Sequence, residues 1–412
     1  MSGRRLQGLA RVLSLLGPLV LLAGCESTTP RQETAEPFLF RALDLRQQDA
    51  QGQPAWSLTS PEARYDIGKR LAKARQPRGL IYRNGQPHYD IRANGGTVVN
   101  NGEIIQLEGD VVVTLLGPDP VQIHADQLRW IPRRDLMEID RRPWASDHRS
   151  RLSAESARFY VLQDRLELSG KPQLRQWAAA PKGRPDPVGL GQPDLVLTAD
   201  SATWHPRTGA FSAPGPVQGE HHEPRGSGQT LRARALGGNL RQQLLALEAP
   251  VQVVDPGRKA VLEAQRTVWD LAARRLSSDQ PFRARIDRLQ VRGDRLTIDL
   301  GSETVAIPQA CQLDQPGEQL QADQCLWHWP KGQIRATGAV VVRRRANRQI
   351  TRADQLQGRI GKNGLAVFSS PGSRVHSELT LPPPGGTQPG DPPLASGQQP
   401  AGRRQAGPPV TF

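Results

Sequence analysis

A short pattern recurs along most of the chain and constrains its fold more than any other feature of the sequence. Each clear copy alternates apolar and polar residues up to a small residue, continues with a polar pair, and has an aromatic residue five positions after the small one. The clearest copies read VQIHADQLRW (121–130), SRLSAESARFY (150–160), LVLTADSATW (195–204), AVLEAQRTVW (260–269) and EQLQADQCLW (318–327). Weaker copies have Ser60, Ala93, Ala233, Gly293 and Ala353 as the small residue.

The copies follow one another at a nearly constant spacing. Their small residues lie 29 to 34 positions apart, except for an interval of 45 between Ala154 and Ala199. This interval contains the Pro- and Gly-rich stretch 178–194, and removing its 17 residues restores the period. We therefore expect a linker at 178–194, between a first module (38–177) and a second module (195–381).

The alternation within one copy predicts a bent β structure. In Val121, Ile123 and Ala125 every second side chain faces the same way, as in a half-buried strand. Leu128 and Trp130 have the opposite phase, so a bulge or corner at the polar pair must turn the strand onto a second sheet. A unit of about 30 residues cannot bury its own apolar face, so the units must stack.

The sequence thus predicts an all-β fold, an open β-jellyroll or V-shaped stack of two sheets with an apolar interior. The one stretch with a helical appearance, residues 67–75, is short. The recurring aromatic residues have two interpretations, as core spacers at the corner or as the lining of an apolar groove. The candidate groove residues are Tyr65, Trp130, Phe159, Trp204, Trp269 and Trp327.

An acidic residue directly follows the small residue in several copies. Among these residues are Asp126, Glu155, Asp200, Asp323 and Asp354. A catalytic group is needed once, not once per repeat, so we interpret these acids as corner residues whose carboxylates accept hydrogen bonds from nearby backbone amides.

The first residues resemble an export signal. Arginines precede an apolar core that is too short to span a bilayer unaided, and LAGC ends it at Cys25. We therefore expect 1–24 to be a lipoprotein signal peptide, Cys25 to be lipidated, and 25–37 to be a polar tether. The alternative, an uncleaved anchor helix over 6–24, is disfavoured by Gly17 and Pro18 in its middle. Either way the body of the protein is exported.

Export would place Cys311 and Cys325 in an oxidising compartment, where they are candidates for a disulfide. They flank QPGE (315–318), a turn sequence between two expected strands. A centred four-residue turn would not place them directly opposite each other, so two buried free thiols remain the alternative.

Composition and motifs exclude several classes of protein. The net charge of +14 favours anionic partners, but the basic residues are scattered, so nucleic acid is not expected. The chain has no GxSxG, Walker, GxGxxG or CxxC motif, and we expect neither an enzyme nor a cofactor. The run EHHE (220–223) lies among glycines and proline and is expected to be a solvated turn rather than a metal site. The Pro- and Gly-rich tail 382–412 is expected to be disordered.

The N-terminal part of the chain resembles the LptC family, the periplasmic component of lipopolysaccharide export. The resemblance is carried by FRALDLRQQD (40–49), WSLTSPEARYD (56–66) and YDIRANGGTVVNNGEIIQLEGDVVV (89–113). It is specific over about 38–177, and the later repeats resemble the related LptA/OstA module. The expected lipid anchor and the doubled length depart from the usual family pattern.

The resemblance implies a membrane-anchored β-jellyroll in the periplasm, held at the inner membrane. Such a protein takes lipopolysaccharide from an ATP-driven transporter and passes it along an apolar groove to an LptA/OstA-like bridge protein docked on an edge strand. Two alternatives stay open, an exported β-solenoid enzyme or lectin acting on polysaccharide, and an outer-membrane scaffold lipoprotein. We expect the second module to extend the groove.

Overall fold

The computed structural model describes residues 38–178, 191–222, 228–346, 348–360 and 366–380. The expected signal peptide, Cys25, the tether, most of the 178–194 linker and the C-terminal tail lie outside these residues. Everything that is described belongs to one compact unit, Pro37–Phe412. Among the described residues, no helix has the length and apolar character that crossing a membrane requires.

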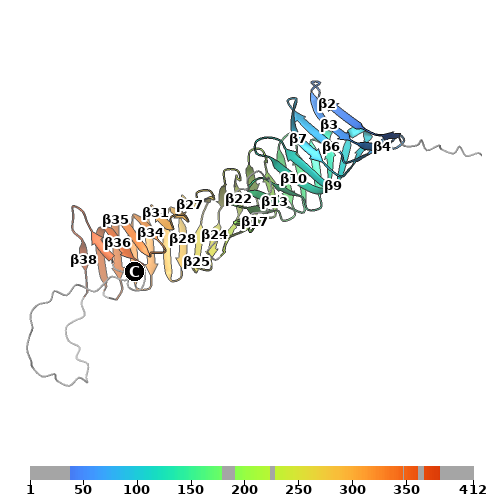
Figure 1. The fold of residues 1–412 in the computed structure, drawn as a ribbon. Helices are drawn as coiled ribbons and strands as arrows, with labels where there is room; N and C mark the ends of the chain where they lie inside the picture. The colour runs from blue at the N-terminus through green and yellow to red at the C-terminus, as the bar shows by residue number, and fades with distance from the viewer. Residues whose placement is uncertain (1–37, 179–190, 223–227, 347, 361–365, 381–412) are drawn as a thin grey trace, which may run out of the picture. The chain divides into compact units, whose positions relative to one another are not determined.

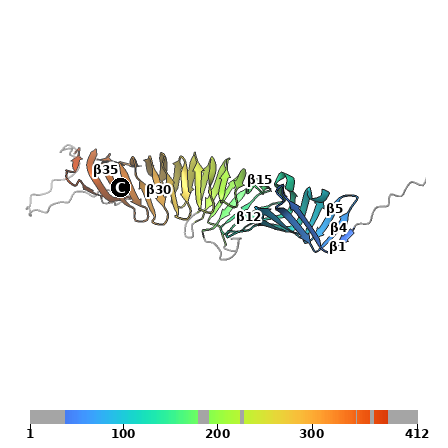
Figure 2. The same cartoon turned by 90° about the horizontal axis from the view of Figure 1, so that it is seen from above.

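The described chain forms 38 strands, all paired antiparallel, which lie side by side in chain order (Figures 1 and 2). The pairings make two ladders. Four long strands contribute to both: β9 (Ile104–Leu115), β10 (Val121–Ile131), β35 (Gln333–Arg344) and β36 (Gln349–Arg359).

The first ladder also contains β1 (Phe38–Phe40), β4 (Glu62–Asp66), β5 (Leu71–Arg75), β8 (Gly95–Val99), β11 (Leu136–Asp140), β14 (Ser156–Tyr160), β15 (Arg165–Ser169), β18 (Ser201–Trp204), β19 (Ala210–Ala213), β22 (Ala235–Asn239), β23 (Leu244–Glu248), β26 (Thr267–Asp270), β27 (Arg275–Ser278), β30 (Leu296–Asp299), β31 (Thr304–Ile307), β34 (Gln324–His328) and β37 (Ala366–Ser369).

The second ladder also contains β2 (Leu43–Gln48), β3 (Pro54–Ser60), β6 (Arg78–Arg83), β7 (Gln86–Arg92), β12 (Trp144–Ser146), β13 (Ser150–Ser153), β16 (Gln173–Gln176), β17 (Leu195–Ala199), β20 (Val217–His221), β21 (Gln229–Ala233), β24 (Val251–Asp255), β25 (Ala260–Ala264), β28 (Phe282–Ile286), β29 (Leu289–Gly293), β32 (Cys311–Gln315), β33 (Glu318–Ala322) and β38 (His376–Glu378). Two short 3-10 helices, Asn100–Gly102 and Pro132–Arg134, lie in turns of the first ladder.

The chain changes ladder at each of the predicted corners. In β10 the register shifts between Ala125 and Gln127, so the strand pairs with β12 before the shift and with β11 after it. At most other corners the small residue ends, or directly follows, a strand of the second ladder and the next strand joins the first, as at Ala199 and Ala322. The change of hydrophobic phase predicted at the polar pair is confirmed.

Apolar side chains from both ladders fill the space between them as one cluster. Within the described ranges the ladders do not close on themselves, because β1, β2, β37 and β38 each pair on one side only. The prediction of an open all-β structure of two apposed sheets is confirmed. The helical appearance of 67–75 is misleading, since these residues form a turn, held by a hydrogen bond from the Lys69 amide to Asp66 Oδ1, and strand β5.

The recurring acids do not bond backbone amides as predicted. Among the described hydrogen bonds, none runs from a backbone amide to the carboxylates of Asp126, Glu155, Asp200, Asp323 or Asp354. Instead, Glu155 and Asp323 lie against glycines of the neighbouring corner, Gly170 and Gly338, where a Cβ atom would overlap the acidic side chain. Both glycines have positive φ, 78° and 76°, so the acid covers a backbone site that only glycine occupies easily.

The stretch 178–194 connects two strands of one hairpin. On either side of it β16 pairs with β17, and in the first ladder β15 pairs with β18. Both ladders therefore run past the predicted linker without a break. The strand pairing shows no boundary between the two predicted modules, so the division into modules stays a prediction.

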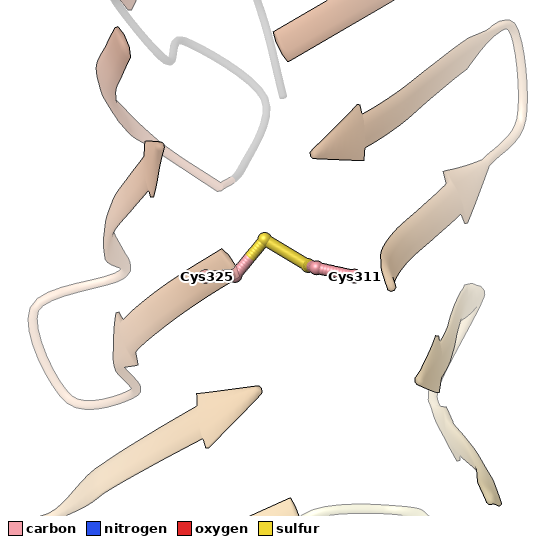
Figure 3. Close-up of a disulfide and its surroundings, with 2 residues drawn as sticks. All are labelled: Cys311 and Cys325. Atoms are coloured by element: carbon pink, nitrogen blue, oxygen red, sulfur yellow. A yellow bond between two sulfur atoms is a disulfide. The ribbon is translucent and has the colours of Figure 1, made fainter. Parts of the chain in front are cut away.

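Cys311 and Cys325 form a disulfide with their Cα atoms 5.9 Å apart (Figure 3). They are not partners in one hairpin. Cys311 begins β32 of the second ladder, opposite Ala322, while Cys325 lies in β34 of the first ladder, opposite Ile307. The disulfide therefore joins the two ladders at their corner. The pairing that the sequence suggests, across the turn at 315–318, would instead lie within one hairpin.

Candidate functional site

The space between the ladders opens into a cavity of about 350 Å³ in the second half of the chain. Strands β20, β21, β24, β25, β28 and β29 of the second ladder face strands β26, β27, β30, β31 and β34 of the first ladder across it. Its walls are mostly aliphatic, with Leu231, Val253, Leu276, Val291 and Ile298 among the lining residues. A cavity with such walls excludes charge and favours hydrocarbon chains.

Two of the six predicted groove aromatics line this cavity, Trp269 and Trp327. Trp269 lies in β26 and is buried, and His221 approaches its ring edge-on with the ring centroids 5.0 Å apart. Trp327 lies in β34, opposite Val305, and is half-buried. Their partly open surroundings distinguish them from the aromatics of the earlier repeats.

The aromatics of the earlier repeats fill the interior instead of lining a space. Phe159 and Trp204 are completely buried, and Trp130 is 4% exposed. Trp130 packs edge-on against Trp56, and Phe159 against Tyr89, with centroids 5.6 and 5.5 Å apart.

Tyr65 differs from both groups of aromatics. It is half-buried, contacts Phe40, and donates its hydroxyl to Asn101 Oδ1 at 3.3 Å. The recurring aromatics sit in first-ladder strands just beyond the corner, and Trp130, Phe159 and Trp204 are core residues there, as the interpretation as core spacers requires. A role for them in binding a ligand stays a prediction.

A polar network lies at one side of the cavity, at the strand ends away from the corners. His221 Nδ1 lies 3.0 Å from Gln229 Oε1, and Gln229 Nε2 donates to Asp255 Oδ2 at 3.2 Å. The Arg258 guanidinium pairs with the carboxylate of Asp255. The acid of this cavity wall is therefore neutralised by an arginine and hydrogen-bonded by an amide, as a buried charge requires.

His221 is a cavity residue that the sequence interpretation missed. It lies at the end of β20, on the same side as buried Val217 and Gly219, and not on a solvated turn. The alternation of Val217, Gly219 and His221 was the sequence signal for this strand. The adjacent His222 and the glycines that follow it suggested a loop instead. Glu223 lies outside the described residues, within which no group of His, Cys, Asp or Glu side chains is arranged to hold a metal.

Between residues 119 and 243 polar side chains connect the ladders on the side opposite the corners. Arg241, in a first-ladder turn, donates Nη1 to Asp119 Oδ2 in a second-ladder turn at 2.8 Å. Arg149, in the second ladder, donates Nη1 to Gln243 Oε1 in the first, also at 2.8 Å. We call these two contacts the clasp, since they close the mouth of the interior.

A buried group of polar residues reinforces the closure. The Tyr89 hydroxyl, from the second ladder, donates to Asp164 Oδ1 in the first at 2.8 Å, and the Arg207 amide donates to Asp164 Oδ2 at 2.6 Å. Burial, then the neighbouring Asp164 charge and hydrogen bond, raise the pKa of Tyr89. Burial and the Arg207 and Arg83 charges lower the pKa of His88. The tyrosine is therefore a neutral donor across the mouth.

The interior thus has two parts with different packing. Behind the clasp, the space lined by Leu152, Leu197 and Phe211 amounts to only about 10 Å³, against about 350 Å³ in the cavity. Large side chains such as Trp204 are completely buried in this part. The first part is therefore more tightly packed than the surroundings of the cavity.

The comparisons with known proteins agree with the sequence resemblance over part of the chain. Residues 12–175 match the family model for LptC, lipopolysaccharide-assembly, LptC-related. No curated protein matches. One similar solved structure is LptH of Pseudomonas aeruginosa, described as the LptA-homologous periplasmic component of the lipopolysaccharide transport device. The two sequences are 17% identical. The match covers 31% of this chain and 79% of that chain at a TM-score of 0.24. Over residues 12–175 the chain is therefore similar to the LptC-related family of lipopolysaccharide assembly.

Proposed function

We propose that this protein carries lipopolysaccharide across the periplasm by sheltering its acyl chains between the two ladders. The observation that supports this proposal best is the 350 Å³ cavity, with Trp269, Trp327 and aliphatic side chains in its walls. Each methylene group moved from water into such surroundings contributes about 0.8 kcal/mol. The Asp255–Arg258 pair leaves no uncompensated carboxylate to repel the phosphates of an incoming lipid.

The proposal includes an inner-membrane anchor and two partners. Lipidation of Cys25 would hold the protein at the outer face of the inner membrane, where an ATP-driven transporter supplies the lipid. The chain carries no nucleotide-binding motif, so the transporter is the source of energy. An LptA/OstA-like bridge protein would receive the lipid.

The open edges of the ladders support docking by strand addition. At one end β1 and β2 each have one side without a partner strand among the described residues, and the β1 residues Phe38 and Leu39 are 54% and 56% exposed. At the other end β37 and β38 have the same property. An incoming strand can satisfy such an edge with main-chain hydrogen bonds.

Movement of lipid through the first part of the interior requires the ladders to separate. Trp130, Phe159 and Trp204 fill the space there, and the clasp closes the mouth. We therefore infer that lipid enters the cavity directly from the side or that the transporter opens the first part when it docks. Both routes end in the cavity, which is the site to test.

Site-specific photo-crosslinking in cells tests the proposal. A photoreactive amino acid at Val291, which lines the cavity, is expected to form adducts with lipopolysaccharide. The neighbouring Gln290 and Arg292 point to the other face of β29 and are exposed, so the same amino acid there serves as the matched control. Equal labelling at all three positions, or none at Val291, would refute the proposal.

A further inference from the structure

Four arginines gather at the turn between β35 and β36. Arg343, Arg344, Arg345 and Arg348 line a hollow of about 390 Å³ together with Asp314 and Glu318. We propose that this hollow binds a phosphate group. That the phosphate belongs to a transported lipid rests on the function proposed above, whereas the phosphate site itself does not.

Arg344 is positioned like a binding residue. Its side chain is only 13% exposed, and its Nε donates to Glu318 Oε1 at 2.8 Å, with Glu318 14% exposed. Glu318 also accepts a hydrogen bond from Gln315 Nε2 at 2.9 Å, which fixes the carboxylate. Nη2 of Arg344 is buried and has no hydrogen-bond partner among the described residues. A buried donor left in this state is satisfied when an anion enters.

Four arginines and two carboxylates, Asp314 and Glu318, line the hollow, so the charges around Arg344 are unbalanced in favour of an anion. Glu318 is committed to Arg344, and Arg343 donates Nη1 to the neutral Gln321 Oε1 at 2.8 Å. Within the described part of the chain, neither Arg343 nor the exposed Arg345 and Arg348 has a carboxylate partner. Each guanidinium group offers paired donors that match the oxygens of phosphate.

The backbone holds the arginines in place. The Arg345 amide donates to the Gly317 carbonyl at 2.9 Å, which fixes this turn to the neighbouring β32–β33 turn, and the Arg348 amide donates to the Arg345 carbonyl at 3.3 Å. The site is therefore carried by two connected hairpins rather than by independent side chains.

The hollow also lies beside the apolar interior. Arg344 and Glu318 share the inward phase of buried Val342 and Leu320, at the strand ends away from the corners. Strands β32, β33 and β35 directly continue the ladder that contributes β28 and β29 to the cavity. A molecule with acyl chains in the interior and phosphate on its head group has its charged end at this rim.

Binding of phosphate by the full chain, purified in detergent, tests the site. The double variant Arg345→Gln/Arg348→Gln removes two exposed cations, and Arg232→Gln/Arg283→Gln, from exposed positions of β21 and β28, is the control with the same change in net charge. Isothermal titration with inorganic pyrophosphate is expected to show binding about tenfold weaker in the first variant and unchanged in the control. An equal loss in both variants, or in neither, would overturn the proposal.

A second measurement identifies the source of the phosphate. Lipopolysaccharide and the same lipid after phosphatase treatment are compared for binding to the chain and to both variants. Loss of binding with Arg345→Gln/Arg348→Gln for the untreated lipid alone supports a lipid-borne phosphate. Loss for pyrophosphate alone supports a site for free phosphate. If pyrophosphate and lipopolysaccharide both bind Arg345→Gln/Arg348→Gln as tightly as the parent chain, the phosphate site is refuted. Lipopolysaccharide crosslinking at Val291 in the same experiments would still support the lipid-carrier function.

Discussion

The guanidinium of Arg241 reaches the carboxylate of Asp119 across the mouth of the interior, with Nη1 and Oδ2 2.8 Å apart and 122 positions between them in the sequence. Arg241 also donates Nη2 to the Pro206 carbonyl at 3.0 Å. One arginine thus connects a turn of the second ladder with two turns of the first. The contact lies between the tightly packed first part of the interior and the part that contains the cavity.

Removing this contact is expected to loosen the mouth more than it weakens the fold. Asp119 is largely exposed, so Asp119→Asn should cost less than about 1 kcal/mol of unfolding free energy. Amide hydrogen exchange in the β22–β23 turn should nevertheless become faster, because opening there no longer breaks an ion pair. Asp126→Asn, at an exposed corner, is the control. Exchange that stays at the level of the parent chain would show that the clasp does not hold the mouth.

Two tryptophans with the same place in the repeat should differ in their contribution to stability. Trp204 is completely buried, so Trp204→Ala is expected to cost about 3–5 kcal/mol. Trp327 is half-buried at the cavity wall, so Trp327→Ala should cost about 1–2 kcal/mol. Denaturant unfolding of both variants measures the difference. Equal losses would mean that Trp327 is an ordinary core residue.

A pair of glycines tests the packing of the corner acids. Gly338 and Gly317 have φ values of 76° and 88°, but a Cβ atom would overlap Asp323 only at Gly338, while Gly317 has open space. Gly317→Ala is expected to cost about 1 kcal/mol and Gly338→Ala about 2–4 kcal/mol. Adding Asp323→Gly should recover part of the loss at Gly338. Without recovery, the destabilisation has another origin than the overlap.

The buried Asp147 gives stability a distinct pH dependence. Desolvation raises the pKa of this carboxyl in the folded state, against hydrogen bonds from the amides of Arg149 and Ser150 and the charge of Arg241. The folded state then binds the proton more tightly than the unfolded state. The contribution of Asp147 is therefore favourable below its unfolded pKa and is lost as pH rises through the folded pKa.

Asp147→Asn removes this titration while keeping an oxygen that accepts the two amide hydrogen bonds. Unfolding free energies measured between pH 4 and pH 7 should show the parent chain losing stability relative to the variant as pH rises. A difference that is constant over this range would mean that the carboxyl does not titrate with a raised pKa.

The corners could be predicted from the sequence because they depend on local phase. The shift of apolar residues from Ala125 to Leu128 requires a bulge wherever both halves of the strand are buried. Residues 67–75 have a helical appearance because a turn followed by the alternating strand β5 imitates helical spacing over a few residues.

The cavity and the clasp could not be predicted in this way. Spacing determines which way Trp204 and Trp269 point but not how much space the facing strand leaves for them. The contact between Asp119 and Arg241 depends on turns more than a hundred positions apart, for which a single sequence carries no signal. The geometry of the disulfide could not be predicted either, because its two cysteines lie in different ladders.

The four long strands set limits on how the ladders can move. β9 and β10 near the beginning, and β35 and β36 near the end, each pass through the corner as one continuous strand and pair in both ladders. These strands therefore connect the two ladders through continuous backbone. The strands from β11 to β34, which lie between these two pairs in the chain, each belong to one ladder only, so no continuous strand passes through the corner there. The ladders can therefore separate more easily there than at the long strands.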